Sequence, residues 1–301
     1  MDLFALDVNI QTPCTIALGY FDGVHLGHRA VIERAVSEAK KRGCRSAVFS
    51  FVDKEKKCSK KAARGEIFDR ERCCEIIKEL GVDFVIMPDF SEFCELSPQQ
   101  FVSLLCKKLC AVALYCGEDY RFGKNAEGNV QMLASISKEV GIELFVTEKV
   151  MLDGAPVSST RICEALRNGK PELAEKLLGR PYSLKAQVVN GKHIGSAQLY
   201  PTVNQRFGED SVIPKNGVYV SRVKYAGEIL PAVTNIGVCP TVQSGQTIPV
   251  AETYIIDKQI QLYGKTVEVE LKHFLRQEKK FESVEALKAQ ISADIEAAKT
   301  I

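Results

Sequence analysis

The first half of the chain alternates short apolar runs with longer stretches in which apolar residues recur every three or four positions. The runs are rich in Val, Ile and Phe and cover 15–19, 46–52, 83–87, 111–115 and 143–147. Short runs of this kind predict buried β-strands, and the helical spacing between them predicts helices that cover the strands. This alternation favours a parallel sheet with helices on its faces.

The helix before residue 110 has a clear signal at its start. Ser97 is followed by Pro98 and Gln100, which are an N-cap, a proline in the first turn and the glutamine of a capping box. We therefore predict a helix from this point to Leu109. Another helix, from Pro171 to Leu178, is the last before the pattern changes.

The second half has alternating β-type runs separated by Gly, Pro and Asn. The strand candidates are 184–190, 217–224, 231–237, 250–257 and 265–272. Such a series favours an antiparallel barrel or sandwich. Ser283 is expected to cap one final helix, whose apolar stripe consists of Val284, Leu287, Ile291 and Ile295. We expect two domains, residues 1–180 and 181–301.

Composition agrees with a soluble two-domain chain. Of the 301 residues, 46% are hydrophobic and 26% charged, and no apolar stretch reaches the roughly 18 residues of a membrane span. The start lacks the basic region of a signal peptide, so we expect a cytoplasmic protein. Forty basic and 38 acidic residues leave a formal charge of +2, which argues against a nucleic-acid partner.

A histidine pair lies between the first predicted strand and the first predicted helix. The segment reads Gly19-Tyr20-Phe21-Asp22-Gly23-Val24-His25-Leu26-Gly27-His28. A helix amino end that follows a strand offers backbone N–H groups and a positive dipole to an anion. Two imidazoles beside a glycine could stabilise charge that grows on one phosphate. The alternative is that one histidine caps the helix and the other packs beside it.

The same segment resembles the nucleotidylyltransferase signature in its FAD synthetase form. Cys116 to Gly123 resembles that family's G-x-D/N-F-x-F-G segment, and Val157 to Ile162 resembles its S-S-T-R-I motif near the phosphates. This resemblance implies catalytic roles for His25 and His28. It also implies nucleotide or phosphate binding by Gly19, Phe21, Asp22, Gly27, Ser158, Ser159, Thr160 and Arg161, and flavin binding by Asp119 and Phe122.

The β-rich half carries a second set of motifs. Leu199-Tyr200-Pro201-Thr202-Val203-Asn204 resembles the G-F-P-T-A-N motif of riboflavin kinases, which implies that Thr202 and Asn204 bind Mg²⁺ with ATP. Further matches follow in order at Asn216–Tyr219, Thr234–Thr241, Ala251–Asp257, Leu262–Gly264 and Phe274–Phe281. Glu252 is the expected catalytic base, and the alternative is a solvent-facing glutamate on an alternating strand. Arg276 is expected near the flavin, unless it is an ordinary surface arginine.

Together the motifs resemble the bacterial bifunctional riboflavin kinase/FMN adenylyltransferase family over nearly the whole chain. The resemblance implies a nucleotidylyltransferase-type, Rossmann-like α/β domain followed by a riboflavin-kinase-type antiparallel β-barrel with a C-terminal helix. It implies phosphorylation of riboflavin to FMN by ATP, then adenylylation of FMN to FAD with release of pyrophosphate. Mg²⁺ is the expected metal, and no tightly bound redox cofactor is required. We expect a monomer or weak oligomer whose partners are riboflavin, FMN and ATP, and no membrane partner.

Two departures from the kinase pattern keep alternatives open. Ser196 stands where the family usually has arginine, and Leu199 where it has glycine. Loss of a cation and of a flexible glycine would weaken the kinase. A flavin-binding relative, or one that only adenylylates FMN, is therefore one alternative. Another is a nucleotidylyltransferase that acts on a different phosphorylated acceptor.

Overall fold

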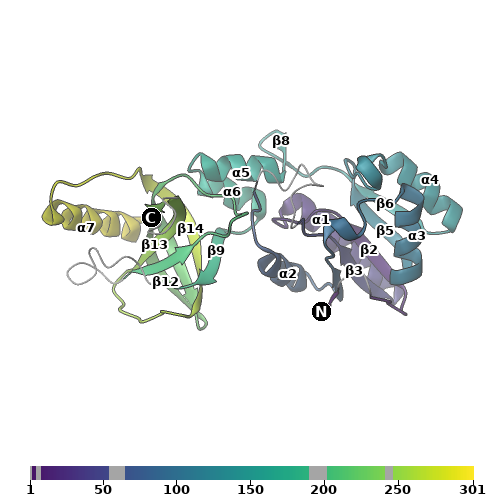
Figure 1. Cartoon of the computed structure of the whole chain (residues 1–301), viewed down its shortest axis with the longest axis horizontal. Helices are drawn as coiled ribbons and strands as arrows, with labels where there is room; N and C mark the ends of the chain where they lie inside the picture. The colour runs from purple at the N-terminus through teal and green to yellow at the C-terminus, as the bar shows by residue number, and fades with distance from the viewer. Residues whose placement is uncertain (1, 5–7, 54–64, 190–201, 241–246) are drawn as a thin grey trace. The chain divides into compact units, whose positions relative to one another are not determined.

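A computed structural model describes residues 2–4, 8–53, 65–189, 202–240 and 247–301 (Figure 1). Ser196 and Leu199, which depart from the kinase pattern, lie outside these residues. Internal contacts divide the chain into two compact units, Met1–Ser159 and Thr160–Ile301. The domain boundary near residue 180 stays a prediction, because the helices α5 (Ser159–Arg167) and α6 (Pro171–Leu178) lie between the two positions.

The first unit is built on a six-stranded parallel sheet. Its strands are β1 (Asp2–Phe4), β2 (Cys14–Leu18), β3 (Arg45–Phe49), β4 (Phe84–Ile86), β5 (Ala111–Gly117) and β6 (Glu143–Thr147). Their order across the sheet is β1-β4-β3-β2-β5-β6. The chain therefore moves outward from β2 to β3 and β4 on one side, and then returns to β5 and β6 on the other. All five predicted strands are confirmed, and the three-residue β1 was too short to predict.

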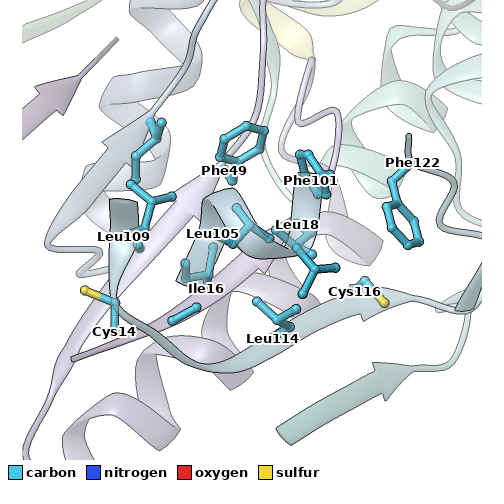
Figure 2. Close-up of a cluster of buried hydrophobic side chains, with 14 of the residues drawn as sticks. Cys14, Ile16, Leu18, Phe49, Phe101, Leu105, Leu109, Leu114, Cys116 and Phe122 are labelled. Atoms are coloured by element: carbon cyan, nitrogen blue, oxygen red, sulfur yellow. The ribbon is translucent and has the colours of Figure 1, made fainter. Parts of the chain in front are cut away.

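Helices cover both faces of this sheet. They are α1 (Leu26–Arg42), α2 (Arg70–Glu79), α3 (Pro98–Leu109) and α4 (Val130–Val140). Alternate residues of β2 face opposite layers: the Thr15 hydroxyl donates to the Ala35 carbonyl of α1 at 2.8 Å, whereas Ile16 packs with Leu105 of α3 in the core cluster that Figure 2 shows. The predicted capping box of α3 is confirmed, since the Ser97 and Gln100 side chains each accept a hydrogen bond from the other residue's backbone N–H. A two-stranded hairpin, β7 (Met151–Leu152) and β8 (Ala155–Pro156), completes the unit.

The second unit contains the predicted antiparallel barrel. Its strands are β9 (Tyr182–Gln187), β10 (Val203–Arg206), β11 (Gly217–Tyr225), β12 (Glu228–Pro240), β13 (Thr247–Ile255) and β14 (Thr266–Arg276). The order is β10-β13-β12-β11-β14-β9. An antiparallel bridge between Val189 and Asn204 joins the two edges, and the Val189 N–H donates to the Asn204 carbonyl at 2.8 Å. The apolar barrel interior includes Val203, Val223, Ala232 and Ile255.

The final helix, α7 (Val284–Thr300), packs on the outside of the barrel (Figure 1). The Ser283 hydroxyl accepts from the Ala286 N–H at 3.1 Å, so the predicted N-cap is confirmed. Ile291 and Ile295 pack with Val218 of β11 and its neighbours. Val284 was expected in the same stripe, but it is 45% exposed. The apolar stripe therefore begins after the first residue of the helix.

None of the described helices is long and apolar enough to cross a membrane. The nine cysteines whose side chains are described are all free thiols.

Candidate active sites

The histidine segment lies at the carboxyl edge of the parallel sheet, where the strand order reverses. β2 ends at Leu18 and α1 begins at Leu26, so the motif forms the connection between them. The neighbouring strand β5 ends at Gly117, and Asp119 follows it at the same edge. Ligands of open α/β sheets bind at such a switch point, outside the carboxyl ends of the strands. The fold thus brings the two predicted segments to one edge.

His25 is the N-cap of α1. Its Nδ1 accepts a hydrogen bond from the His28 N–H at 3.2 Å. The two imidazole rings stack, with centroids 3.6 Å apart and planes 19° apart. Because Nδ1 accepts, the neutral ring carries its proton on Nε2, which is therefore a donor. The structure therefore contains the helix cap of the alternative interpretation. The same cap fixes the tautomer of His25 in which Nε2 could donate to a phosphate.

Two glycines make room for the aromatic packing around this pair. A Cβ on Gly27 would lie 3.1 Å from Cε1 of His25, and a Cβ on Gly19 would lie 2.7 Å from the Phe21 ring. Phe21 is buried and meets His28 edge-on, with centroids 5.1 Å apart. The structure gives Gly19, Phe21 and Gly27 a role in shaping the site. Their direct contact with a nucleotide stays a prediction.

Asp22 links this segment to the S-S-T-R-I motif. Its Oδ1 accepts a hydrogen bond from the Ser159 hydroxyl at 2.7 Å, and both side chains are buried. Asp22 is thus placed to position Ser159, and phosphate binding by either residue stays a prediction. Ser158 precedes α5, and Thr160 and Arg161 fall in the second unit. Their predicted phosphate contacts are not tested by the geometry within either unit.

The two predicted flavin-binding residues after β5 differ in their surroundings. Phe122 is 5% exposed and packs with Phe101 in the core, with ring centroids 5.7 Å apart. The Phe122 ring is thus covered by other side chains of the protein. Its predicted flavin contact rests on the sequence resemblance alone. Asp119 is exposed in the turn after Gly117 and is accessible to a ligand. A small cavity is lined by the predicted residues Phe21 and Asp22 together with residues that were not predicted, including Tyr20, Phe51 and Arg70.

In the second unit, strand register gathers polar residues on the outer face of the barrel. Asn204 of β10 pairs with Glu252 of β13, and Glu252 also pairs with Asn235 of β12. Directly paired residues on neighbouring strands project from the same face. The flanking Ala251 and Thr253 are buried inside the barrel. Asn204, Glu252 and Asn235 therefore form one polar row, and we call it the outer row.

The predicted metal ligands lie at one end of the outer row. Asn204 Nδ2 donates to the Thr202 hydroxyl at 3.2 Å and to its carbonyl at 3.1 Å. A hydroxyl and a side-chain amide offer hard oxygen donors, which suit Mg²⁺ with the remaining positions filled by water and phosphate. The residues present therefore fit the expected ion.

Glu252 is exposed, as expected if it were a solvent-facing glutamate on an alternating strand. It has polar neighbours on both adjacent strands, however, and a second carboxylate nearby. Partial removal from water, and then the nearby Glu278 carboxylate, raise the pKa of Glu252 above its ordinary value. Glu278 is held by Asn235, whose Nδ2 donates to Oε1 at 3.2 Å. Neither Asn235 nor Glu278 was predicted as a site residue, although both lie inside segments that resemble the kinase family.

Arg276 contacts the protein rather than open solvent. Its Nε and Nη2 donate to the two carboxylate oxygens of Asp294 in α7, at 2.9 and 2.7 Å, and its Nη1 donates to the Gln277 carbonyl at 3.0 Å. The residue therefore anchors α7 to the end of β14. Its predicted flavin contact would require part of this network to be shared or released.

Two family models match successive parts of the chain. The FAD synthetase model matches residues 7–161, and the riboflavin kinase model matches residues 178–301. The first match contains both histidines and Asp119. The second contains the outer row. Each model thus covers one of the two clusters of candidate site residues.

Individual relatives extend the similarity over both parts at once. Bifunctional riboflavin kinase/FMN adenylyltransferases from Listeria monocytogenes and Escherichia coli K12 are each 36% identical, over 93% and 94% of this chain and 89% and 91% of theirs. The Bacillus subtilis protein of the same name is 32% identical over 94% of this chain and 91% of its own. Among solved structures, the Macrolide-efflux Protein from Streptococcus pneumoniae is 28% identical, with a TM-score of 0.87 over 98% of this chain and 96% of that one.

Proposed function

The chain belongs to the family of bifunctional riboflavin kinases/FMN adenylyltransferases, and we propose that it converts riboflavin to FMN and FMN to FAD at two separate sites. The observation that carries this proposal is the separation of the candidate residues. His25 and His28 lie at the start of α1 in the first unit, whereas Asn204 and Glu252 belong to the barrel. Each unit therefore carries the candidate residues for one of the two reactions.

In the barrel, Glu252 accepts the proton of the terminal ribityl hydroxyl while that oxygen attacks the γ-phosphorus of ATP. A bond forms between the hydroxyl oxygen and phosphorus, and the bond to the ADP oxygen breaks. A carboxylate whose pKa is raised is a stronger proton acceptor than an ordinary one. Thr202 and Asn204 would hold Mg²⁺, which neutralises phosphate charge when it is bound.

In the first unit, an FMN phosphate oxygen attacks the α-phosphorus of a second ATP, and pyrophosphate leaves. The nucleophile is already ionised, so this step needs no general base. His25 and His28 donate hydrogen bonds to the phosphate oxygens as charge develops on them, and the amino end of α1 adds its N–H groups and dipole. Ser158, Ser159, Thr160 and Arg161 bind the phosphates that leave, and Asp119 binds the flavin side.

An enzyme that only adenylylates FMN is the weaker alternative. The pairing of Asn204 with Glu252 supports a kinase site, and the relatives named for both activities match over both halves of the chain. A cytoplasmic location and a monomeric or weakly associating state, without nucleic-acid or membrane partners, belong to the same proposal.

The test is a flavin product analysis. The protein is incubated with riboflavin, ATP and Mg²⁺, and riboflavin, FMN and FAD are separated by chromatography. We expect FMN and then FAD from riboflavin, and FAD with pyrophosphate from supplied FMN. FAD from supplied FMN alone would leave only the first unit active, and no product from either flavin would refute the proposal.

A further inference from the structure

The outer row continues beyond the proposed base Glu252. On one side of Glu252 lies β10, which carries Asn204 and is preceded by Thr202. On the other side lies β12, which carries Asn235. In the proposed kinase reaction Glu252 contacts the acceptor hydroxyl, and this hydroxyl attacks the γ-phosphorus of the nucleotide. If the Thr202 side holds the nucleotide, the Asn235 side faces the acceptor, riboflavin.

Glu278 lies beside Asn235, on the side of the outer row that we assign to the acceptor. Its Oε1 accepts from Asn235 Nδ2 at 3.2 Å, and the same oxygen would clash with a Cβ on Gly237. Gly237 is two residues beyond Asn235 on β12, so the two positions share a face of the strand. The absence of a side chain at Gly237 makes the space that Glu278 fills. Asn235 and Gly237 together hold the carboxylate against β12.

The position of Glu278 against β12 brings its carboxylate near that of Glu252. The charge of Glu278 contributes to the raised pKa of Glu252, after partial burial. Within the described parts of the chain, neither carboxylate is paired with a cation. Neighbouring carboxylates are hydrogen-bond acceptors only, and a chain of alcohol groups supplies O–H donors at successive positions. A polyol is therefore the ligand chemistry that fits this arrangement.

We propose that Asn235 and Glu278 form a subsite that binds the secondary hydroxyls of the ribityl chain of riboflavin. The inference rests on the proposed role of Glu252, because it places the terminal ribityl hydroxyl at that carboxylate. The hydroxyls further along the chain then reach the Asn235 side of the row. Glu278 accepts from them, and Asn235 holds Glu278 in place and offers its own amide oxygen.

The test compares two substrates in the kinase assay: riboflavin, and an analogue that keeps the terminal hydroxyl but has hydrogen in place of the secondary hydroxyls. Glu278→Ala should raise the KM for riboflavin about tenfold or more, the effect of losing hydrogen bonds to a charged group. The KM for ATP should not change. On the analogue, Glu278→Ala and the unmodified protein should have the same KM, whereas kcat falls alike on both substrates because the loss of the Glu278 charge lowers the pKa of Glu252. Asn235→Ala should follow the same pattern with a smaller loss on riboflavin.

Glu282→Ala is the matched control, since it removes an exposed glutamate four residues further along the same segment. It should leave both KM values unchanged. Thermal unfolding of each variant shows whether the barrel is still folded, because FMN adenylylation belongs to the other unit. Equal rises in the KM for riboflavin and for the analogue, a changed KM for ATP, or an unchanged KM for riboflavin would each overturn the subsite. Kinase activity that survives in Glu252→Gln would instead refute the proposed function on which the subsite rests.

Discussion

Asp22 and Ser159 are joined by a buried hydrogen bond of 2.7 Å, although 137 positions separate them in the chain. Asp22 follows β2, and Ser159 begins α5. The Asp22 backbone carbonyl also accepts from the Phe68 N–H at 3.0 Å, so the segment is held at more than one point. Through this contact the histidine segment is fixed to Ser159 within the first unit.

We predict that Ser159→Ala lowers both stability and FAD formation. A buried carboxylate that loses a hydrogen-bond donor retains the cost of its desolvation, so the free energy of unfolding should fall by about 1–3 kcal/mol. Ser159→Thr keeps a hydroxyl and should lose less. Urea unfolding and the FMN-to-FAD assay measure the two effects. A Ser159→Ala protein as stable and as active as the original would show that the bond has no such role.

A second prediction separates the two roles of His25. Asparagine is a good N-cap, so His25→Asn should keep α1 stable while it removes the imidazole. FAD formation should then fall by about 10²–10³, the usual effect of losing one donor to a transition state. His25→Ala should show the same loss of rate and an additional loss of roughly 1 kcal/mol in stability. Thermal unfolding and initial rates distinguish the variants, and a fully active His25→Asn would mean that His25 serves only as a cap.

A third prediction concerns Asp83, which precedes β4 and holds the start of β3. Burial alone would raise the pKa of Asp83, but hydrogen bonds from the Ser46 N–H and hydroxyl and from Arg45 outweigh burial and lower it. A pKa that is lower in the folded state means that the ionised form stabilises the fold. This contribution is present above the pKa of the unfolded chain and is lost as the pH falls toward the folded value.

Asp83→Asn should therefore be less stable than the original protein at neutral pH, and the two stability curves should converge in acid. Chemical unfolding at a series of pH values gives both curves. Asp153→Asn is the control, since Asp153 is exposed and has a left-handed backbone with φ of 53°, which asparagine also tolerates. Parallel curves for Asp83→Asn and the original protein would contradict the assignment.

Local signals predicted most of the fold. The Ser97 capping box and the Ser283 cap depend on residues a few positions apart, so the sequence displays them directly. Strand β10 was missed for a physical reason. Its Gln205 is fully buried in the barrel, where Nε2 donates to the Ala186 and Val267 carbonyls, and a buried glutamine breaks the apolar alternation expected of a strand.

The candidate sites were predictable where their chemistry is local. His25 and His28 stand out by spacing and by position between a strand and a helix. The surroundings of Phe122 and Arg276 depend instead on distant partners, Phe101 and Asp294, which no spacing reveals. Asn235 became a candidate only when strand register placed it beside Glu252, because neighbours across a sheet are not neighbours in the sequence.

The central claim is that two separate sites act in sequence, and the most direct measurement is a mixing experiment with two single variants. His28→Ala should convert riboflavin to FMN and stop there. Glu252→Gln should make nothing from riboflavin but should convert supplied FMN to FAD. Mixed together with riboflavin, ATP and Mg²⁺, the two should again form FAD, because FMN released by one variant is the substrate of the other. A mixture that forms FMN without FAD, or a folded variant that has lost both activities, would contradict the account.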